Sequence, residues 1–248
     1  MDRMLYIAMT GASQAMNALG VSSNNLANAK TTGFKADLVQ ARSMQAYGEG
    51  LPTRVFSMME NPGHKMSAGA VVTTGRELDV AVKGDGWLAV ADGEGNEAYS
   101  RNGRLQLGAD GLLQNGSGQY VLDEAGNPLF VPQPYAKLEV GGDGTVSVLP
   151  AGAPANGVEI VGRIKLVNPD PATLDKGEDG LFRPLDGTVL PPDPTLTLMQ
   201  GALEDSNVNV VEELTAMINL QRNFELQVKV MKTAEQTDEA QSSLLRLG

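Results

Sequence analysis

Apolar residues recur at alternating spacings of four and three at both ends of this chain, and this repeat limits its fold more than any other feature. Such spacing is the a/d pattern of helices that pair in a coiled coil. The N-terminal repeat runs through Leu5, Met9, Ala12, Met16, Leu19, Ser23 and Leu26. The C-terminal repeat runs through Val210, Leu214, Met217, Gln221, Phe224, Val228 and Met231. Both ends are therefore predicted to form amphipathic helices.

The two predicted helices need partners. An alanine and a serine interrupt the first repeat, so this helix would be marginal in water when isolated. Ser206 and Asn209 are candidate N-caps for the second helix. Its apolar surface is wider than one partner helix covers, because further apolar residues lie beside the repeat. These are Ile218, Leu220, Leu226 and Val230. Two interpretations stay open: the helices pack on the chain's own β-domain, or several subunits bury them.

The middle of the chain has the pattern of an antiparallel β-domain. Short strand-like runs are separated by Asp-Gly or Asn-Gly pairs, which are strong hairpin signals. These pairs begin at residues 85, 92, 102, 110, 115, 143 and 156. We predict an α+β, mainly β fold in which N- and C-terminal helices flank the β-domain and pair as a coiled coil on assembly. Its parts are a helical domain of residues 1–37 plus 205–248, an extended connecting region at 38–76 and a β-rich domain at 77–204.

Charge and cysteine content exclude several kinds of protein. The formal net charge is -11, whereas nucleic-acid binding needs a basic surface that displaces counterions from phosphates. The chain has no cysteine, so disulfides and thiolate metal sites are excluded. No apolar run has the length of a membrane span, and the N-terminus lacks the pattern of a cleaved secretory signal. We therefore expect no nucleic-acid partner, no membrane span and no cleaved signal peptide.

The motifs contain no catalytic, cofactor-binding or metal-binding set. The Asp-Gly turns lack the alternating carboxylates of a calcium loop. Gly84 and Gly86 lack the third glycine of a dinucleotide fingerprint, because Ala89 stands in its place. His64 is the only histidine, so a catalytic triad would have one possible base. We expect His64 to be a solvated loop residue, and we predict no cofactor, no metal and no enzymatic activity.

A polymer subunit explains this layout best. Helices that are weakly apolar alone gain burial from neighbouring subunits, so they would form where neighbours exist. The polar stretch "NNLANAKTTGFK" at 24–35 closes the first repeat. Its Gly33 is placed for a left-handed turn, with Phe34 packing beyond it.

The asparagines of this stretch have two interpretations. They could form an ordinary polar helix end. Alternatively, Asn24, Asn25 and Asn28 could set the register of an assembly, because a single buried asparagine can fix coiled-coil register. We favour the second interpretation, since a second apolar repeat is present at the other end of the chain.

Four blocks of the sequence resemble, in the same order, the bacterial flagellar rod and hook proteins. They are "SSNNLANAKTTGFKAD", "TTGRELDVAVKGDGWLAV", "YSRNGRLQLGADGLLQNGSGQYVL" and "GALEDSNVNVVEELTAMINLQRNFELQVKVMKTAEQTDEA". Together they cover nearly the whole chain. The length and the opening "MDRMLYIAMTGASQ" are most similar to proximal-rod members. Arg104 and Leu88 depart from aromatic residues common in the family, which bears on local packing of the β-domain.

The resemblance implies a non-enzymatic structural subunit, exported by the flagellar type III apparatus and assembled helically in the periplasmic rod. Its partners would be copies of itself and other proximal and distal rod proteins. Family members pair their terminal helices as an inner layer, with the β-domain outside. Carried over to this chain, that layer would use Leu5, Met9, Met16, Leu19 and Leu26 with Leu214, Met217, Phe224, Val228 and Met231.

Rival functions stay open at this point. A distal-rod protein would differ from a proximal one in its place within the basal body. A secreted β-rich carbohydrate-active protein would need two carboxylates across a sugar, such as Asp79 and Asp85 or Glu94 and Glu97. An export chaperone fits less well, because those proteins are usually small and helical.

Overall fold

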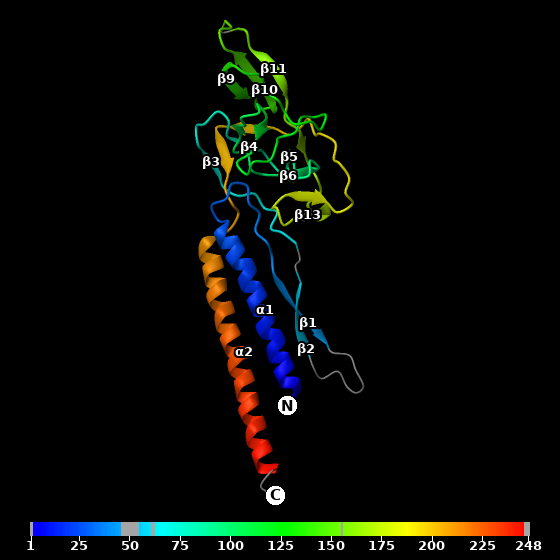
Figure 1. Ribbon diagram of the computed structural model, residues 1–248, viewed down its shortest axis with the longest axis vertical. Coiled ribbons are helices and arrows are strands. Elements are labelled where there is room, and N and C mark those ends of the chain that lie inside the picture. Colours follow the sequence, from blue (N-terminus) through cyan, green and yellow to red (C-terminus); the bar gives the residue numbers. More distant parts are fainter. Residues whose placement is uncertain (1, 46–54, 61–62, 155, 246–248) are drawn as a thin grey trace. The chain divides into compact units, whose positions relative to one another are not determined.

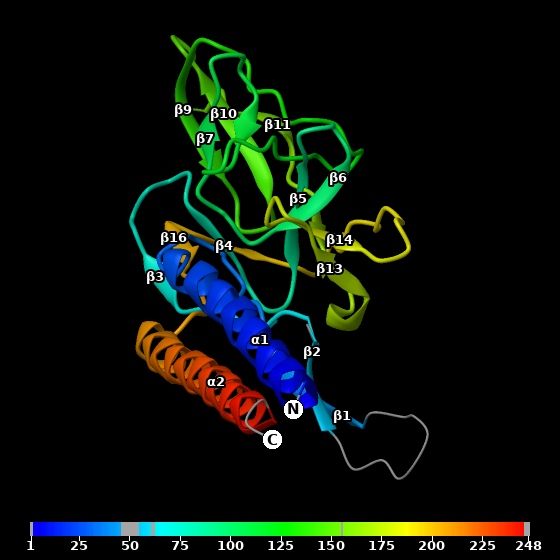
Figure 2. The same ribbon diagram turned by 60° about the horizontal axis from the view of Figure 1, so that its bottom comes forward.

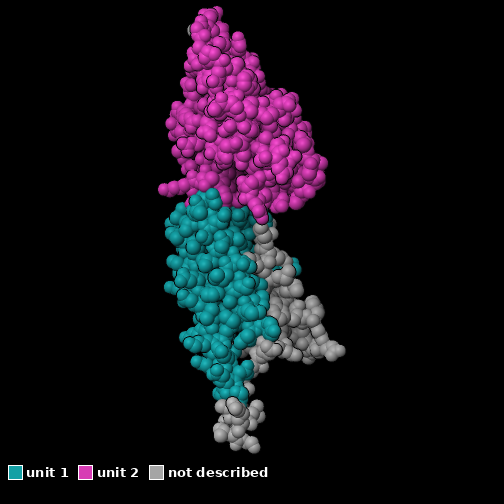
Figure 3. Space-filling model, viewed as in Figure 1, with its two compact units in different colours: residues 1–28, 36–65, 208–248 teal, residues 29–35, 66–207 magenta. Residues whose placement is uncertain are grey.

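The computed structural model describes residues 2–45, 55–60, 63–154 and 156–245. Their contacts divide the chain into two units, which Figure 3 colours separately. Unit 1 comprises residues 1–28, 36–65 and 208–248, and unit 2 comprises residues 29–35 and 66–207. Residues 46–54 and 61–62 of the predicted connecting region lie outside the described residues. Each unit is therefore assembled from segments that are far apart in the sequence.

Unit 1 contains two long helices and one hairpin. The helices are α1 (Asp2–Ala27) and α2 (Val210–Leu245), and the strands are β1 (Gln40–Gln45) and β2 (Val55–Glu60), which pair antiparallel. Figures 1 and 2 both show α1 and α2 side by side. Over the described residues, neither helix is long and apolar enough to cross a membrane. The two predicted terminal helices are confirmed.

The two helices run antiparallel in one register. The Asn25 amide donates to a Glu213 carboxylate oxygen at 3.0 Å near one end of the pair. Fourteen residues earlier in α1, a Cβ built on Gly11 would lie 3.1 Å from the side chain of Gln227, fourteen residues later in α2. One register therefore holds over at least four turns of each helix.

Small residues form the buried face of α1. Ala8, Ala12, Ala15 and Ala18 are each at most 8% exposed. A stripe of alanines lets two helix backbones approach closely, so larger side chains are not needed at this seam. Leu5, Met9 and Met16 of the predicted repeat are instead 36%, 49% and 52% exposed. The pairing within the chain thus uses a stripe displaced from the predicted one.

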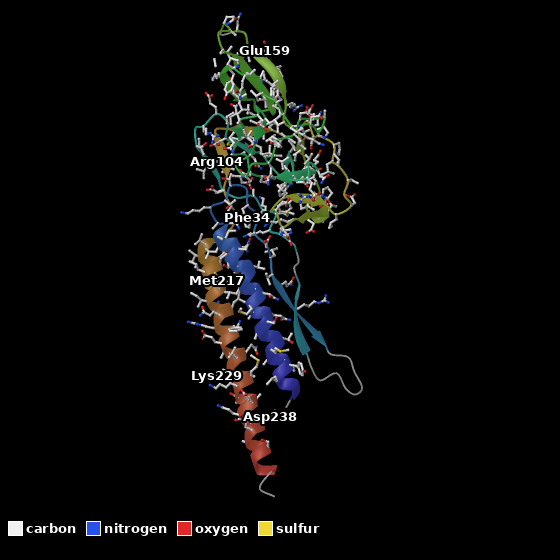
Figure 4. All side chains as sticks on the ribbon, in the orientation of Figure 1. Phe34, Arg104, Glu159, Met217, Lys229 and Asp238 are labelled. Atoms are coloured by element: carbon white, nitrogen blue, oxygen red, sulfur yellow. The ribbon has the colours of Figure 1, made fainter. Side chains whose placement is uncertain are left out.

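Larger residues on α2 complement the alanine stripe. Met217, Leu220, Phe224 and Met231 are half-buried and recur at spacings of three, four and seven. Met217, Lys229 and Asp238, labelled in Figure 4, mark the course of α2 along its length.

Asn209 caps the N-terminus of α2. Its side-chain oxygen accepts the backbone N–H groups of Val211 at 3.1 Å and Glu212 at 3.4 Å. These are two of the donors that lack a partner within a helix's first turn. The predicted N-cap is therefore confirmed at Asn209, and α2 begins one residue later.

The strands of unit 2 pair antiparallel. They are β3 (Val71–Thr73), β4 (Val80–Val82), β5 (Trp87–Ala91), β6 (Glu97–Ser100), β7 (Gln106–Leu107), β8 (Leu113–Gln114), β9 (Tyr135–Val140), β10 (Thr145–Pro150), β11 (Glu159–Arg163), β12 (Leu166–Val167), β13 (Leu174–Lys176), β14 (Phe182–Pro184), β15 (Leu198–Gln200) and β16 (Ala202–Glu204). A five-stranded sheet has the order β12-β5-β6-β14-β13, and a three-stranded sheet has the order β11-β10-β9. Smaller pairs join β15 to β4, β16 to β3 and β7 to β8. The predicted mainly β fold is confirmed.

Aliphatic side chains fill the core of unit 2. Val80, Leu88, Leu105 and Leu113 are fully buried in one cluster. Leu88 therefore occupies an aliphatic core position of unit 2. A second cluster contains the only tryptophan, Trp87, whose ring centre lies 4.6 Å from that of Phe182.

Three turns of unit 2 share one hydrogen-bond pattern. They begin at Asp92, Asn115 and Asp123, whose side-chain oxygens accept backbone N–H groups two and four residues later at 2.8–3.0 Å. The glycine three residues after each has a φ of 84 to 88°. The turns predicted at 92 and 115 are confirmed, but the glycine that needs positive φ is the third residue after the Asx, not the next one.

Gly33 makes the predicted left-handed turn, with a φ of 70°. Its N–H donates to the Glu204 carbonyl at 2.7 Å, and a Cβ would lie 2.3 Å from the Arg101 carbonyl carbon. Both partners belong to unit 2, so the close approach is part of that unit's packing.

Gly33→Ala should lower the free energy of unfolding of unit 2 by more than Gly126→Ala does. Gly126 has a φ of 84° and open space around its Cα, so alanine there carries only the left-handed backbone cost of about 1–2 kcal/mol. Gly33→Ala carries the same backbone cost, and in addition its Cβ would overlap with the backbone of Arg101. Urea unfolding followed by Trp87 fluorescence measures both, and equal losses would contradict the packing role of Gly33.

Candidate functional site

A buried ion cluster, which we define as Lys35, Arg101 and Glu204, lies inside unit 2. The Lys35 ammonium is 2.7 Å from Glu204 Oε1, and the Arg101 guanidinium is 2.8 Å from Glu204 Oε2. The three side chains are at most 2% exposed. Each comes from a different block of the sequence: "TTGFK", "SRNG" and "GALE". The carboxylate therefore joins segments separated by 169 and 103 residues.

The ion cluster is completed by backbone groups. The Gly69 N–H donates to Glu204 Oε1 at 2.9 Å, Lys35 donates to the Ser67 carbonyl at 3.0 Å, and Arg101 donates to the Gly84 carbonyl at 2.7 Å. This nearly complete pairing is what buried charges require.

Trp87 lies against both cations of the ion cluster. The Arg101 guanidinium carbon is 5.3 Å and the Lys35 ammonium is 6.0 Å from its ring centre. These distances are within the range of cation–π attraction. The sole tryptophan is therefore a natural optical probe of the ion cluster.

Burial and the neighbouring charges shift the pKa values of Glu204 and Lys35. Burial alone would raise the pKa of Glu204, but Arg101, Lys35 and the Gly69 N–H outweigh it and hold that pKa below its ordinary value of 4.5. Burial lowers the pKa of Lys35 below its ordinary 10.5, against the opposing effect of Glu204. The ionised carboxylate is thus the form that the folded unit selects.

Acid should remove the contribution of Glu204 to stability. A carboxyl group whose folded pKa is depressed stabilises the fold above its unfolded pKa and loses that effect as the pH falls through the folded value. The difference in urea midpoint between the wild type and Glu204→Gln should therefore be constant above about pH 5.5 and narrow below pH 4.5. A difference that stayed constant down to pH 3 would contradict an ionised Glu204.

Asn25 is a buried hydrogen-bonding centre in unit 1. It is 2% exposed, and its amide nitrogen donates to the Asp37 carbonyl at 2.9 Å and to Glu213 at 3.0 Å. Its amide oxygen accepts the Asp37 N–H at 2.9 Å. These bonds join α1, the segment after it and the first turn of α2, all within one chain.

His64 is not the solvated loop residue that we expected. Its side chain is 7% exposed, and its Nδ1 lies 2.8 Å from an Asp37 carboxylate oxygen. The backbones at 37 and 64 also form an isolated antiparallel bridge. The error arose because the sequence gives no sign that Asp37 and His64 meet across the intervening hairpin.

The other residues of the "NNLANAKTTGFK" stretch make different contacts. Asn24 is exposed, and Asn28 donates to its carbonyl at 3.0 Å one helical turn later. Phe34, labelled in Figure 4, is half-buried, with the Lys176 ammonium 4.1 Å from its ring centre. Of the three asparagines in this stretch, only Asn25 is buried.

A groove of about 730 Å³ lies in unit 1 between α1, α2 and residues 37–39. Its lining combines small residues with the amides of Gln14, Asn219, Asn223 and Gln227. Among the described residues, no group of three or more histidine, aspartate and glutamate side chains is arranged to hold a metal ion.

The predicted interface residues fall into two groups. The half-buried ones lie within the helix pair and are Leu19, Leu26, Met217, Phe224 and Met231. The exposed ones are Leu5, Met9, Met16, Leu214 and Val228, at 36–52%. The prediction did not include Lys35, Arg101 and Glu204, because isolated charges in a turn-rich sequence resemble ordinary surface residues.

Asn25→Ala should lower the stability of unit 1 by about 1–3 kcal/mol, because it removes the hydrogen bonds to the half-buried Glu213 carboxylate and to two backbone groups of Asp37. Asn17→Ala is the matched control, since Asn17 is exposed on the same helix and alanine is the better helix former. Hydrogen exchange of α1 and α2 measures the effect. Equal protection in the two variants would contradict the role of Asn25.

Three family models match the chain in order. Residues 5–35 match "Flagella basal body rod protein", residues 81–148 match "Flagellar hook protein FlgE/F/G D1 domain", and residues 199–244 match "Flagellar basal body rod FlgEFG protein C-terminal". The first and third matches include Lys35 and Glu204 of the ion cluster.

Curated relatives match over the full length. The flagellar basal-body rod protein FlgF of Escherichia coli (strain K12) is 42% identical over 100% of both chains. The FlgF protein of Caulobacter vibrioides is 34% identical over 100% of this chain and 99% of its own. The flagellar basal-body rod protein FlgG of Bacillus subtilis (strain 168) is 32% identical over 95% of this chain and 96% of its own.

Proposed function

We propose a structural role in the flagellar basal body, because this chain belongs to the flagellar basal-body rod protein family. Full-length similarity to proteins named FlgF and FlgG supports a rod subunit that associates with other rod proteins and with itself. Members of this family are structural proteins and not enzymes. The rival interpretation as a carbohydrate-active protein is therefore set aside.

Within the rod, we propose a position in the proximal section. The support is that the 42% and 34% identical relatives carry the name FlgF, whereas the distal-type name FlgG first occurs at 32% identity among these relatives. The subunit would polymerise helically in the periplasm, after export by the flagellar type III apparatus without cleavage of a signal peptide. The distal rod is the alternative position.

The observation that carries the proposal is a set of exposed apolar side chains on both helices of unit 1. Leu5, Met9 and Met16 are exposed on α1, and at about 100° per residue their side chains point within about 40° of one another. On α2, Leu214 and Ile218 are 46% and 53% exposed and lie one turn apart. Long apolar side chains that the chain itself leaves uncovered mark an interaction surface.

The remaining predicted interface residues have distinct places in this proposal. Asn24 is exposed and stays within the proposed contact surface. Asn25, Asn28, Gly33 and Phe34 would act indirectly, by holding the ends of the segments that carry the helices. Residues 1–37 plus 205–248 would form the inner part of the rod, and the β-rich region 77–204 the outer part.

Leu214→Asp should abolish incorporation into the rod, because a carboxylate buried in an apolar contact without a partner costs several kcal/mol, roughly 4 or more. The isolated subunit should keep its stability, since this position is 46% exposed. The test is complementation of cells that lack the chain, with motility and electron microscopy of purified basal bodies as readouts. Without the chain, the rod should stop at its proximal section.

Thr215→Asp is the matched control for that experiment. It adds the same charge at the next residue, which is exposed and points about 100° away from Leu214. Rods should form with this variant. Normal rods with Leu214→Asp, or failure of both variants, would contradict an apolar contact at Leu214.

A further inference from the structure

We infer that the ion cluster makes closure of unit 2 conditional on its last strand, β16, because Lys35 and Arg101 can be buried only when Glu204 is in place. The inference concerns the folding of unit 2 and does not depend on the proposed function.

The three charges of the ion cluster lie far apart along the chain. Lys35 comes from the first segment of unit 2, Arg101 follows β6, and Glu204 is the last residue of β16. The side chains of the two cations are 0% and 2% exposed. The carboxylate that faces both of them is thus supplied last in the order of synthesis, which starts at the N-terminus.

Within the described part of the chain, the two cations have only neutral bonding partners besides Glu204. Apart from Glu204, the bonding partners of the two cations are the neutral carbonyls of Ser67 and Gly84. Lys35 and Arg101 bond to the two oxygens of one carboxylate, so the two cations are close enough to repel. Without Glu204, closure would bury two like charges with no carboxylate bonded to them, which is far more costly than burying a neutral pair.

Three hydrogen-bond donors converge on the carboxylate of Glu204. Lys35, Arg101 and the Gly69 N–H all point to its two oxygens. Glutamine at this position would keep the shape but carry one oxygen, and would direct an N–H₂ donor toward other donors. The substitution Glu204→Gln is therefore expected to cost more stability than the loss of one hydrogen bond.

The final segment also completes the sheets. β15 pairs with β4, and β16 pairs with β3, so the segment that brings Glu204 also covers two strands from the beginning of the unit. Docking of this segment therefore neutralises the two cations and pairs β15 and β16 with their partner strands at the same time. Unit 2 is consequently closed by its C-terminal segment and remains open in a chain that has not yet supplied it.

The test uses the full-length chain and four variants. Glu204→Gln removes the charge with little change in shape. Glu139→Gln is the control, because Glu139 is 50% exposed and paired with a surface lysine. Lys35→Met combined with Glu204→Gln removes one cation as well. The triple variant Lys35→Met, Arg101→Met and Glu204→Met removes every charge of the ion cluster.

Hydrogen exchange of β5 and β6, together with Trp87 emission, reports closure. In Glu204→Gln, protection should fall by at least about a hundredfold, and emission should shift toward that of the unfolded chain. Glu139→Gln should match the wild type. The double variant should recover part of the protection and the triple variant most of it, because buried ions can be replaced by apolar residues of similar volume.

Two results would overturn the inference. One is native protection in Glu204→Gln, which would show that the cations are buried without the carboxylate. The other is a triple variant as unprotected as Glu204→Gln, which would show that shape or hydrogen bonding, and not charge, controls closure. Exchange is read together with emission because removal of nearby cations can by itself alter the fluorescence of Trp87.

Discussion

The carboxylate of Glu204 is the interaction on which unit 2 depends. It bonds to two cations from segments far along the chain and to the N–H of Gly69, all in a buried setting. The backbone around it is tied to the same place, since the Glu204 carbonyl accepts the Gly33 N–H. A residue that lies just before the last helix thereby fixes the chain just after the first helix, so the ends of unit 2 are held by one side chain and its own backbone.

Local patterns in the sequence predicted much of the fold. The terminal helices, the Asn209 cap, the antiparallel β-domain and several Asx turns follow from spacing and turn chemistry, which act over a few residues. The contacts of His64, Asn25 and the ion cluster could not be predicted in this way. They join residues separated by 12 to 188 positions, and no local rule relates such residues. Family resemblance identified the blocks that carry Asn25 and the ion cluster, but not which side chains meet.

The helix pair shows how a correct period can accompany a displaced contact. Leu5, Met9 and Met16 have the spacing of a seam, and large apolar residues are the usual choice for one. In the chain, the alanines beside them are buried instead. Small residues permit closer packing, and the larger α2 side chains Leu220 and Phe224 fill the space. Hydrophobicity alone therefore does not show which of two adjacent stripes a helix buries against its own partner.

The alanine stripe leaves methionines on the outside of α1. Methionine is unbranched, flexible and polarizable, so it fits surfaces of different shape with little loss of contact. Leucine or isoleucine in its place would favour one fixed geometry. A rod built from several kinds of subunit presents a protein with neighbours that are not identical to one another. In the proposed rod, Met9 and Met16 would allow one helix face to meet unlike neighbours. The assembly would then tolerate different neighbours at this face, while the contact between α1 and α2 inside the subunit stays fixed.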